Sequence, residues 1–247
     1  MSAIVAIPAR MESSRFPGKV LADINGQPML WHVLQGVATA KKVNAVWVVT
    51  DSQEVQSAVT SWGAQALMTR PDCPSGTARI ASVIDQLKAD TIINVQGDEP
   101  LISGEVIDLV AEALETSGSS VATPIFRITE SEDVFNQNLV KVVRDARGRA
   151  LYFSRSAIPH VRDVEPAAWP SVTPFWGHVG VYAYRRQVLE NLNLLPESPL
   201  ESAEKLEQLR LMEAGLIIQT VEVEYRSQGV DTPEDLEQVK KILQGAR

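Results

Sequence analysis

The chain has 247 residues, of which 45% are hydrophobic and 22% are charged, and this suits one large α/β domain with an ample core. Its formal net charge of −8 argues against bulk binding to nucleic acid or to an acidic membrane surface. A single cysteine, Cys73, excludes an intramolecular disulfide and a cysteine-rich metal site. The sequence contains no recognisable secretory leader and no apolar run long enough to cross a bilayer, so we expect a cytoplasmic protein without membrane insertion.

Strands and helices alternate through the first half of the chain. Short apolar runs predict buried strands at residues 3–7, 45–49, 65–68, 91–95 and 120–126. Apolar residues at helical spacing predict helices at residues 28–38, 54–62, 77–87 and 103–114. Asp51 or Ser52 is available to cap the second helix, and Ser103 to cap the fourth. The alternation predicts an α/β fold built on a mostly parallel, doubly wound sheet.

The alternation stops between about residues 140 and 185. Strands are expected at residues 140–143, 150–153 and 179–184, with no helix between them. The proline-rich stretch 158–176 indicates an ordered but irregular excursion. We interpret residues 140–186 as an antiparallel insertion within a single domain of residues 1–247, forming part of a substrate wall and part of a subunit contact. Regular structure resumes with a helix at 202–214, a strand at 216–221 and a final helix at 233–243, capped by Thr232.

A loop rich in cations follows the first predicted strand. It contains Arg10, Arg15 and Lys19, two serines and a Pro-Gly turn. Open α/β sheets bind ligands in loops at the carboxyl ends of central strands, and three clustered cations in an acidic chain need a counter-anion such as a polyphosphate. The loop matches neither the Walker A pattern nor the dinucleotide fingerprint, which argues against an ATPase loop and a nicotinamide enzyme. The alternative is a surface loop whose charges are solvated.

Two aspartates lie at junctions between predicted strands and helices. Asp98 closely follows the strand at 91–95, and Asp231 precedes the final helix. Carboxylates in such positions can hold Mg²⁺ beside phosphate oxygens, because the phosphates supply the other ligands. Each aspartate is also compatible with a turn or capping role. Glu99 is the weaker candidate of its segment because it lies farther from the strand end.

Several other polar residues are ambiguous when taken singly. Ser75, Gly76 and Thr77 enter a predicted helix and suit either nucleotide contacts or ordinary capping. Gln96 suits a substrate hydroxyl or carboxylate as well as a bond to a neighbouring loop. Five residues of the second half suit packing as well as binding: Arg155, Arg162, His178, Tyr182 and Glu207.

Taken together, these motifs resemble those of a known family. In chain order they are Ile7-Pro8-Ala9-Arg10, Ser14-Arg15, Pro17-Gly18-Lys19, Ser75-Gly76-Thr77, Val95-Gln96-Gly97-Asp98-Glu99-Pro100, Tyr152-Phe153-Ser154-Arg155, His178-Val179-Gly180-Val181-Tyr182, Leu206-Glu207-Gln208-Leu209-Arg210 and Gly229-Val230-Asp231-Thr232-Pro233. The set is similar to that of the 3-deoxy-manno-octulosonate (KDO) cytidylyltransferases, or CMP-KDO synthetases, over essentially the whole chain. The resemblance implies a Rossmann-like nucleotidyltransferase fold, a homodimer, and the reaction of CTP with KDO to give CMP-KDO and pyrophosphate for lipopolysaccharide biosynthesis.

The resemblance also implies roles for individual residues. Lys19, Arg10 and Asp98 would be catalytic, and Asp98 and Asp231 would bind Mg²⁺. The nucleotide would be held by Ala9, Arg10, Arg15, Lys19, Ser75 and Gly76. The sugar acid would be held by Gln96, Arg155, Arg162, His178, Tyr182 and Glu207. Arginines in that wall suit the carboxylate of the sugar.

Some positions depart from the family pattern. His160 and Val161 stand where Trp-Asp is usual, although Arg162 is kept, and Ala183 stands where glycine is frequent. The stretch 225–228 lacks a common Pro-Gly. These departures leave open an 8-amino analogue of KDO or a sialic-type sugar acid as the acceptor. A non-catalytic CTP-binding protein is the alternative from a different functional class.

Overall fold

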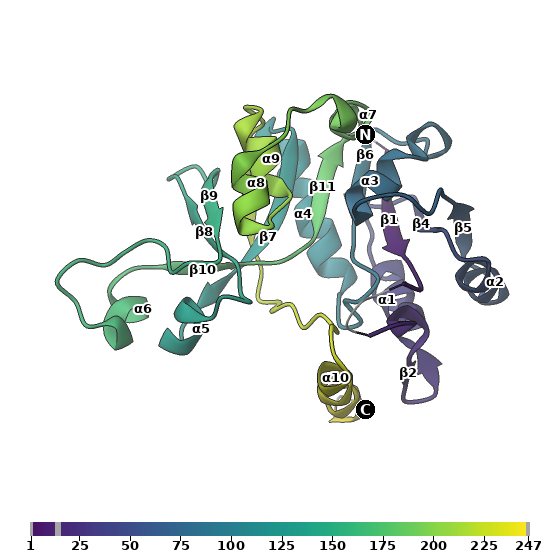
Figure 1. Cartoon of the computed structure of the whole chain (residues 1–247), viewed down its shortest axis with the longest axis horizontal. Coiled ribbons are helices and arrows are strands. Elements are labelled where there is room, and N and C mark those ends of the chain that lie inside the picture. Colours follow the sequence, from purple (N-terminus) through teal and green to yellow (C-terminus); the bar gives the residue numbers. More distant parts are fainter. Residues whose placement is uncertain (1, 13–15, 246–247) are drawn as a thin grey trace.

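A ten-stranded sheet forms the centre of the protein in the computed structural model, which describes residues 2–12 and 16–245 (Figure 1). Its strands are β1 (Ala3–Ala9), β4 (Ala45–Thr50), β5 (Gln65–Met68), β6 (Thr91–Asn94), β7 (Val121–Ile128), β8 (Lys141–Arg144), β9 (Ala150–Ser154), β10 (Phe175–His178), β11 (Tyr182–Arg185) and β12 (Ile218–Glu222). A small hairpin, β2 (Asp23–Ile24) and β3 (Gln27–Pro28), lies outside this sheet.

Helices connect these strands. The α-helices are α1 (Met29–Ala38), α2 (Gln53–Ser61), α3 (Gly76–Ala81), α4 (Gly104–Ser117), α5 (Ser131–Phe135), α6 (Trp169–Val172), α7 (Arg186–Glu190), α8 (Pro199–Glu204), α9 (Gln208–Glu213) and α10 (Pro233–Gly245). Short 3-10 helices are η1 (Lys19–Leu21), η2 (Ile84–Gln86), η3 (Pro166–Ala168) and η4 (Leu192–Leu194).

The sheet combines a parallel part and an antiparallel part. Its order is β5-β4-β1-β6-β11-β7-β10-β8-β9, and β12 also pairs with β7. The pairs among β5, β4, β1 and β6 are parallel, as is the pair of β12 with β7. Strands β8 to β11 pair antiparallel and come from the stretch where the predicted alternation stops. The predicted α/β fold with an antiparallel insertion is confirmed.

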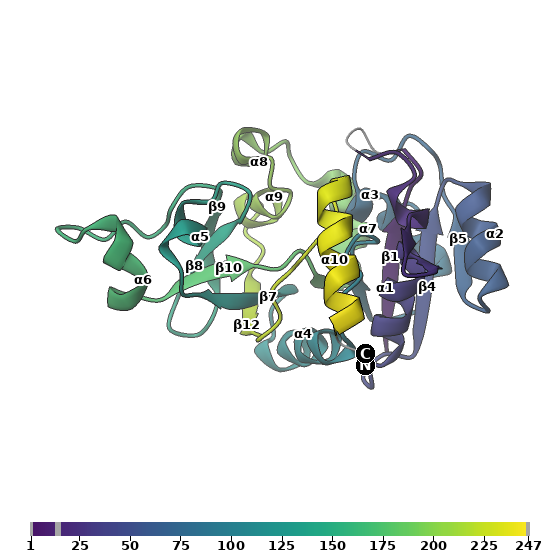
Figure 2. The same cartoon turned by 90° about the horizontal axis from the view of Figure 1, so that it is seen from below.

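Alternate residues of the central strands enter two separate cores. On β1, Val5 and Ile7 belong to one buried cluster, whereas Ile4 and Ala6 belong to the other. Helices α1, α2 and α4 cover the first face, and α3, α7 and α9 cover the second (Figure 2). Since both faces are covered, these strands are continuously apolar, and this explains why the sequence predicts them well.

The strand predicted at 179–184 is wrong in its extent. The chain forms β10 before it and β11 at its end, and both pair with β7. The register changes between them, from Gly177 opposite Phe126 to Ala183 opposite Ala122. The intervening bulge is held by Thr123, whose hydroxyl donates to the carbonyl of Val181 at 2.8 Å.

Two predicted helices are shorter than their sequence patterns. The helix predicted at 77–87 ends at Ala81, where the Ser82 hydroxyl donates to the carbonyl of Arg79 at 2.7 Å and competes with the helical bonds. The helix predicted at 202–214 is divided into α8 and α9 by Lys205, whose φ is 54°. Glu204 and Glu207, on either side of this break, bond to different parts of the protein.

Helix caps also differ in part from expectation. Ser52 caps α2 as predicted, with its side chain accepting from the Val55 N–H, whereas Asp51 has another partner. Ser103 occupies the cap position of α4 without a side-chain bond to the helix. The Thr39 hydroxyl accepts from the Gly104 N–H at 3.0 Å instead.

The C-terminal segment runs from β12 to the part of the protein that contains β2 and α1. After β12 the chain runs extended to α10, which lies apart from α8 and α9 (Figures 1 and 2). Helix α10 packs beside β2 and α1 through Leu236 and Val239, which are buried with Ile24, Met29 and, from the segment before the helix, Val230. This crossing brings residue 231 to the N-terminal loop.

Candidate functional site

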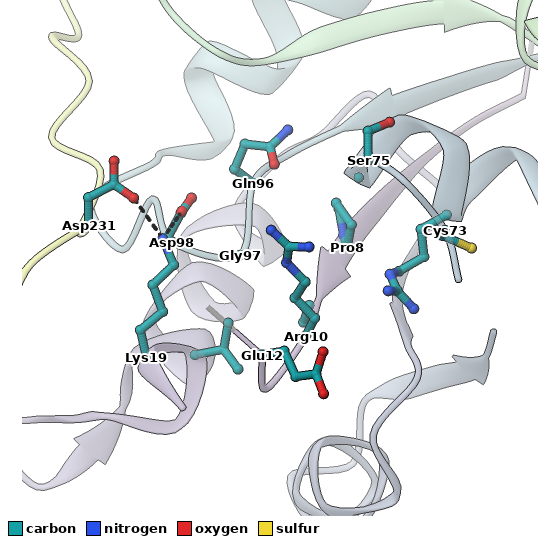
Figure 3. A pocket seen from close by; sticks show the side chains of 14 residues that line it. Pro8, Arg10, Glu12, Lys19, Cys73, Ser75, Gln96, Gly97, Asp98 and Asp231 are labelled. Carbon is teal, nitrogen blue, oxygen red and sulfur yellow. Dashed lines mark hydrogen bonds and ion pairs between the residues drawn. The ribbon is translucent and has the colours of Figure 1, made fainter. Parts of the chain in front are cut away.

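A pocket of about 270 Å³ opens where the carboxyl ends of β1 and β6 meet (Figure 3). These strands are parallel neighbours, with Ala6 opposite Asn94, so the chain leaves both at the same edge. The N-terminus of α3 forms another wall, so close that a Cβ on Gly76 would lie 2.9 Å from Cγ of Pro8. Glycine is therefore required there. The pocket is lined by Pro8, Ala9, Arg10, Glu12, Lys19, Val20, Cys73, Ser75, Gly76, Arg79, Gln96, Gly97, Asp98 and Asp231.

The pocket brings together the described residues that were predicted to bind nucleotide and metal. From the N-terminal loop come Ala9, Arg10 and Lys19, and from α3 and its cap come Ser75 and Gly76. Asp98 and Asp231 meet in it although they lie far apart in the sequence. Gln96, predicted to contact the sugar acid, also lines it, and Arg15 lies outside the described residues.

Lys19 lies between the two aspartates. Its Nζ donates to Oδ2 of Asp98 at 2.5 Å, to Oδ1 of Asp231 at 3.0 Å and to the carbonyl of Val230 at 3.0 Å. Burial alone would lower the pKa of this lysine, but the bonds and charges of Asp98 and Asp231 outweigh it and raise the pKa above its ordinary value. Lys19 therefore has two counter-anions within the chain, in addition to the polyphosphate that the sequence suggests for this loop.

Arg10 has no such partner. It is exposed, and it forms no ion pair with any residue of the ranges 2–12 and 16–245. Its guanidinium points into the pocket, toward Gln96 and Gly97 (Figure 3). Arg10 is thus free to bind an anion there, whereas the positive charge of Lys19 is already shared by two carboxylates.

Arg79 is a pocket residue that the sequence did not predict. Its side chain is 3% exposed and pairs with Asp51 at 2.8 Å. The same guanidinium donates to the Thr69 hydroxyl and to the carbonyl of Arg70. The pair fixes α3 against the end of β4 and so holds one wall of the pocket. An acid at a strand end and an arginine one helix later carry no recognisable motif, so only the tertiary structure reveals the pair.

Glu207, which was predicted to bind the sugar acid, contacts residues on the nucleotide side of the site. Its carboxylate accepts from the Ser75 hydroxyl at 3.1 Å and from the Thr77 hydroxyl at 3.0 Å. Asn94 donates to the same Thr77 oxygen, and Gln96 donates to Asn94. Burial raises the pKa of Glu207, and the two hydroxyl bonds oppose this rise. A continuous polar chain therefore joins Glu207 to Gln96 at the pocket.

The remaining predicted sugar-binding residues do not line this pocket. Arg155 donates to the carbonyl oxygens of Glu204 and Gln137, so its guanidinium supports the β9 region. The side chain of Arg162 is 88% exposed and forms an ion pair with the neighbouring Asp163 at 3.2 Å.

His178 and Tyr182 lie together where β10 passes into β11. Burial lowers the pKa of His178, so its ring is neutral at pH 7. Since the Thr123 hydroxyl donates to the carbonyl of Val181, it accepts from His178 at 3.1 Å, which places the proton on Nε2. The Tyr182 hydroxyl is buried without a hydrogen-bond partner in the described structure. Such an unsatisfied hydroxyl is a group that a bound ligand can satisfy.

The two aspartates suit a divalent cation. Both carboxylates already converge on one positive charge, the Lys19 ammonium, and oxygen ligands of this kind are those that Mg²⁺ prefers. The described residues contain no cluster of three or more acidic, histidine or cysteine side chains able to enclose a metal alone. The pair therefore fits a cation that takes its other ligands from a substrate or from water.

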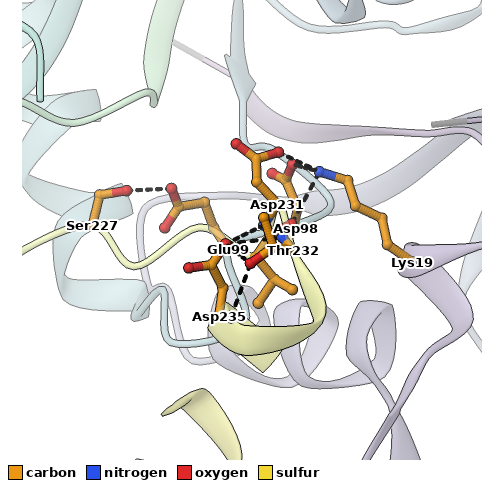
Figure 4. Close-up of polar contacts among 8 residues, drawn as sticks. Lys19, Asp98, Glu99, Ser227, Asp231, Thr232 and Asp235 are labelled. Carbon is orange, nitrogen blue, oxygen red and sulfur yellow. Dashed lines mark hydrogen bonds and ion pairs between the residues drawn. The ribbon is translucent and has the colours of Figure 1, made fainter. Parts of the chain in front are cut away.

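Glu99 has a different position from Asp98. It is 5% exposed and accepts from the hydroxyl of Tyr225 at 2.8 Å. It also accepts from the hydroxyl of Ser227 (Figure 4). Burial raises the pKa of Glu99 to about 7, and these hydrogen bonds oppose the rise. Asp235 accepts from the N–H groups of Asp231 and Thr232 and so holds the start of α10.

Among the described helices, none has the length and hydropathy of a membrane span.

Comparisons with known proteins identify the family of this chain. A model of the cytidylyltransferase family matches residues 4–223. A 3-deoxy-manno-octulosonate cytidylyltransferase of Pseudoalteromonas translucida is 46% identical over 250 residues, which cover 99% of this chain and 98% of the relative. One from Escherichia coli is 44% identical, with coverage of 98% and 96%. The chain belongs to the 3-deoxy-manno-octulosonate cytidylyltransferase family. The resemblance drawn from the motifs is thereby confirmed.

Solved structures give the same result. CMP:2-keto-3-deoxy-manno-octonic acid synthetase complexed with CTP superposes with a TM-score of 0.93 and 43% identity, and the match covers 100% of both chains. A cytidylyltransferase from Leptospira borgpetersenii serovar Hardjo-bovis has a TM-score of 0.64 and 18% identity, so it shares the fold alone. The family model ends at residue 223, and therefore Asp231 and α10 lie beyond it.

Proposed function

We propose that the protein transfers CMP from CTP to KDO, giving CMP-KDO and pyrophosphate. The observation that carries this proposal is the full-length similarity to a CMP-KDO synthetase complexed with CTP. The pocket supports it, because an unpaired arginine, a lysine and two carboxylates surround a space at the edge where α/β sheets bind nucleotides.

The reaction needs positioning and charge neutralisation rather than a covalent enzyme intermediate. The anomeric hydroxyl oxygen of KDO forms a bond to the α-phosphorus of CTP, and the bond from that phosphorus to the bridging oxygen of pyrophosphate breaks. We assign Arg10 and Lys19 to the phosphates, where they stabilise the charge that develops on the transferred group. Ala9, Ser75 and Gly76 line the same pocket and are assigned to the nucleotide, as is Arg15 of the same loop.

Asp98 and Asp231 are assigned to Mg²⁺, which would neutralise phosphate charge and make the attacking hydroxyl more acidic. The sugar acid is assigned to the side of the pocket where Gln96 lies, continued by Glu207, His178 and Tyr182. The unsatisfied Tyr182 hydroxyl supports this side. Arg155 and Arg162 belong to the same proposed set, although neither guanidinium lines the pocket in this structure.

The surfaces of the insertion, residues 140–186, and of helix α5 beside it support a homodimer. Phe135 and Val172 are large apolar residues with 45% and 58% of their area exposed, and they lie on the neighbouring helices α5 and α6. Leu151 on β9 is 60% exposed. We propose that these surfaces meet a second copy, and that the enzyme works in the cytoplasm to supply lipopolysaccharide biosynthesis. Sedimentation of wild type and Val172→Asp tests the dimer, which is refuted if wild type sediments as a monomer at all concentrations.

A panel of substrates tests the activity. Pyrophosphate release is measured with each nucleoside triphosphate and with KDO, 8-amino-3,8-dideoxy-octulosonate and N-acetylneuraminate. We expect CTP and KDO to give the highest kcat/KM. Faster release with another sugar acid would move the acceptor assignment to that sugar. Tight CTP binding without release from any sugar acid would instead indicate a non-catalytic protein.

A further inference from the structure

A buried carboxylate lies beside Asp98 and takes no part in the proposed reaction. Glu99 is 5% exposed, and its oxygens accept from the hydroxyls of Tyr225 and Ser227. The backbone N–H of Gln228 provides a further donor to the same carboxylate. The hydroxyl donors lie 126 and 128 residues away in sequence, so these bonds join two distant parts of the chain, and Figure 4 shows the bond from Ser227.

The residues that Glu99 binds lie in a segment without regular secondary structure. Residues 223–231 belong to neither a helix nor a strand. Val230 donates its N–H to the carbonyl of Asp98 at 2.9 Å, and its own carbonyl accepts from Lys19. A Cβ on Gly229 would lie 3.3 Å from Oε1 of Glu99, so the backbone itself packs against this carboxylate. Contacts with residues 98 and 99 therefore help to set the path of the segment up to Asp231, together with the ion pair of Arg226 with Asp133 and the burial of Val230 beside Ile24 and Met29.

We propose that Glu99 is a positioning residue, which clasps residues 225–228 and so holds Asp231 opposite Asp98. The inference rests on the proposed role of the two aspartates as ligands of Mg²⁺. Because Asp98 and Glu99 are adjacent, the clasp ties one predicted ligand directly to the segment that carries the other. Groups that orient metal ligands in this way commonly change metal affinity or activity by about 10-fold to 100-fold when they are replaced.

The hydrogen bonds of Glu99 with Tyr225 and Ser227, here called the clasp, can be removed by conservative changes of either the donors or the acceptor. Tyr225→Phe and Ser227→Ala each remove one donor and keep the Glu99 carboxylate, and Glu99→Gln keeps its shape without its charge. Arg226→Gln is the matched control, because Arg226 lies between the two donors but its guanidinium pairs with Asp133 on the surface. A second control is Phe153→Leu, a buried change on β9 that destabilises the fold without touching the clasp.

The first measurement is the binding of Mn²⁺ alone to the full-length protein, from the electron paramagnetic resonance signal of the free ion. The second is the Mg²⁺ concentration that gives half of the maximal pyrophosphate release at saturating CTP and KDO. For Tyr225→Phe, Ser227→Ala and Glu99→Gln we expect both values to rise by about 5-fold to 50-fold. Arg226→Gln and Phe153→Leu should remain within about twofold of wild type.

Two outcomes would overturn the proposal. If the three clasp variants melt at lower temperature but keep wild-type metal dependence, Glu99 serves stability only. If Phe153→Leu changes the metal dependence as much as the three clasp variants do, the effect comes from a general loss of fold stability.

Should Glu99→Gln fail to fold, Tyr225→Phe and Ser227→Ala decide alone. Should wild type bind no Mn²⁺ without nucleotide, the Mg²⁺ dependence decides. A wild type with no cytidylyltransferase activity refutes the proposed function instead, and a Mn²⁺ site that Asp98→Asn leaves intact refutes the metal assignment.

Discussion

The ion pair between Arg79 and Asp51 allows a sharp test of how the pocket wall is stabilised. The guanidinium is 3% exposed and the carboxylate 19%, with 2.8 Å between Nη2 and Oδ2. Asp51→Asn leaves a buried positive charge whose remaining acceptors are neutral, the Thr69 hydroxyl and the Arg70 carbonyl. Breaking a buried pair from one side destabilises by about 3–5 kcal/mol, and replacing both partners often restores much of this loss.

The expected values follow from these contacts. Asp51→Asn should lower the free energy of unfolding by about 3–5 kcal/mol. In a domain of this size that loss corresponds to a fall in Tm on the order of 10 °C. The double variant Asp51→Asn with Arg79→Met should be more stable than Asp51→Asn alone, because no unpaired charge remains. Asp72→Asn is the matched control, since Asp72 pairs with Arg70 in the open, where both side chains are more than half exposed. That change should leave the free energy of unfolding nearly unchanged, because solvent screens an exposed pair.

Urea denaturation of wild type, both single variants and the double variant completes the cycle. The coupling energy between Arg79 and Asp51 should reach about 2–4 kcal/mol, larger than for any exposed pair. A coupling energy below about 0.5 kcal/mol would refute the reasoning, because it would mean that the pair is screened as surface pairs are. Equal losses for Asp51→Asn and Asp72→Asn would refute it as well.

Three further predictions concern the site. Lys19→Met and Asp98→Asn should each lower kcat by about 100-fold or more while the far-ultraviolet circular dichroism stays unchanged, and a kcat within tenfold of wild type would contradict the assigned role of that residue. Because burial raises the folded-state pKa of Glu99 to about 7, its stabilising effect is complete below about pH 4.5 and is lost as the pH rises through 7. The difference in unfolding free energy between Glu99→Gln and wild type should thus shift in favour of the variant by about 3 kcal/mol between pH 4.5 and 8 in urea denaturation, and a pH-independent difference would oppose this. Tyr182→Phe should leave Tm unchanged or raise it, because the lost hydroxyl has no partner in the described structure, but it should raise KM for the sugar acid; an unchanged KM would remove Tyr182 from the sugar side.

The meeting of Asp98 with the N-terminal loop could be predicted from local sequence signals. Both follow apolar runs that form parallel neighbouring strands, and the ends of such strands share one edge. The ion pair of Lys19 with Asp231 could not be predicted, because it depends on the path of residues 223–231, which have no helical or strand periodicity. For the same reason the sequence suggested an external counter-anion for a lysine that has two within the chain.

The errors in secondary structure have tertiary causes. Residues 202–214 have an uninterrupted helical pattern, but the chain turns at Lys205 so that Glu204 meets Ser154 while Glu207 meets Ser75. Residues 179–184 are apolar enough for a strand, but the Thr123 hydroxyl holds a bulge in the middle. In both places hydrogen bonds to distant residues override a local preference, and a local pattern carries no information about them.

The distance in sequence between Lys19 and Asp231 also bears on how the protein forms. These residues are 212 positions apart, so the site combines one of the first loops to leave the ribosome with one of the last. The parallel strands β1, β4 and β6 can assemble early, because all three lie in the first 94 residues. The site itself remains incomplete until residue 231 has been synthesised and has docked. A growing or truncated chain that ends before residue 231 therefore has no complete pocket, and contacts of such long range are expected to form late in folding.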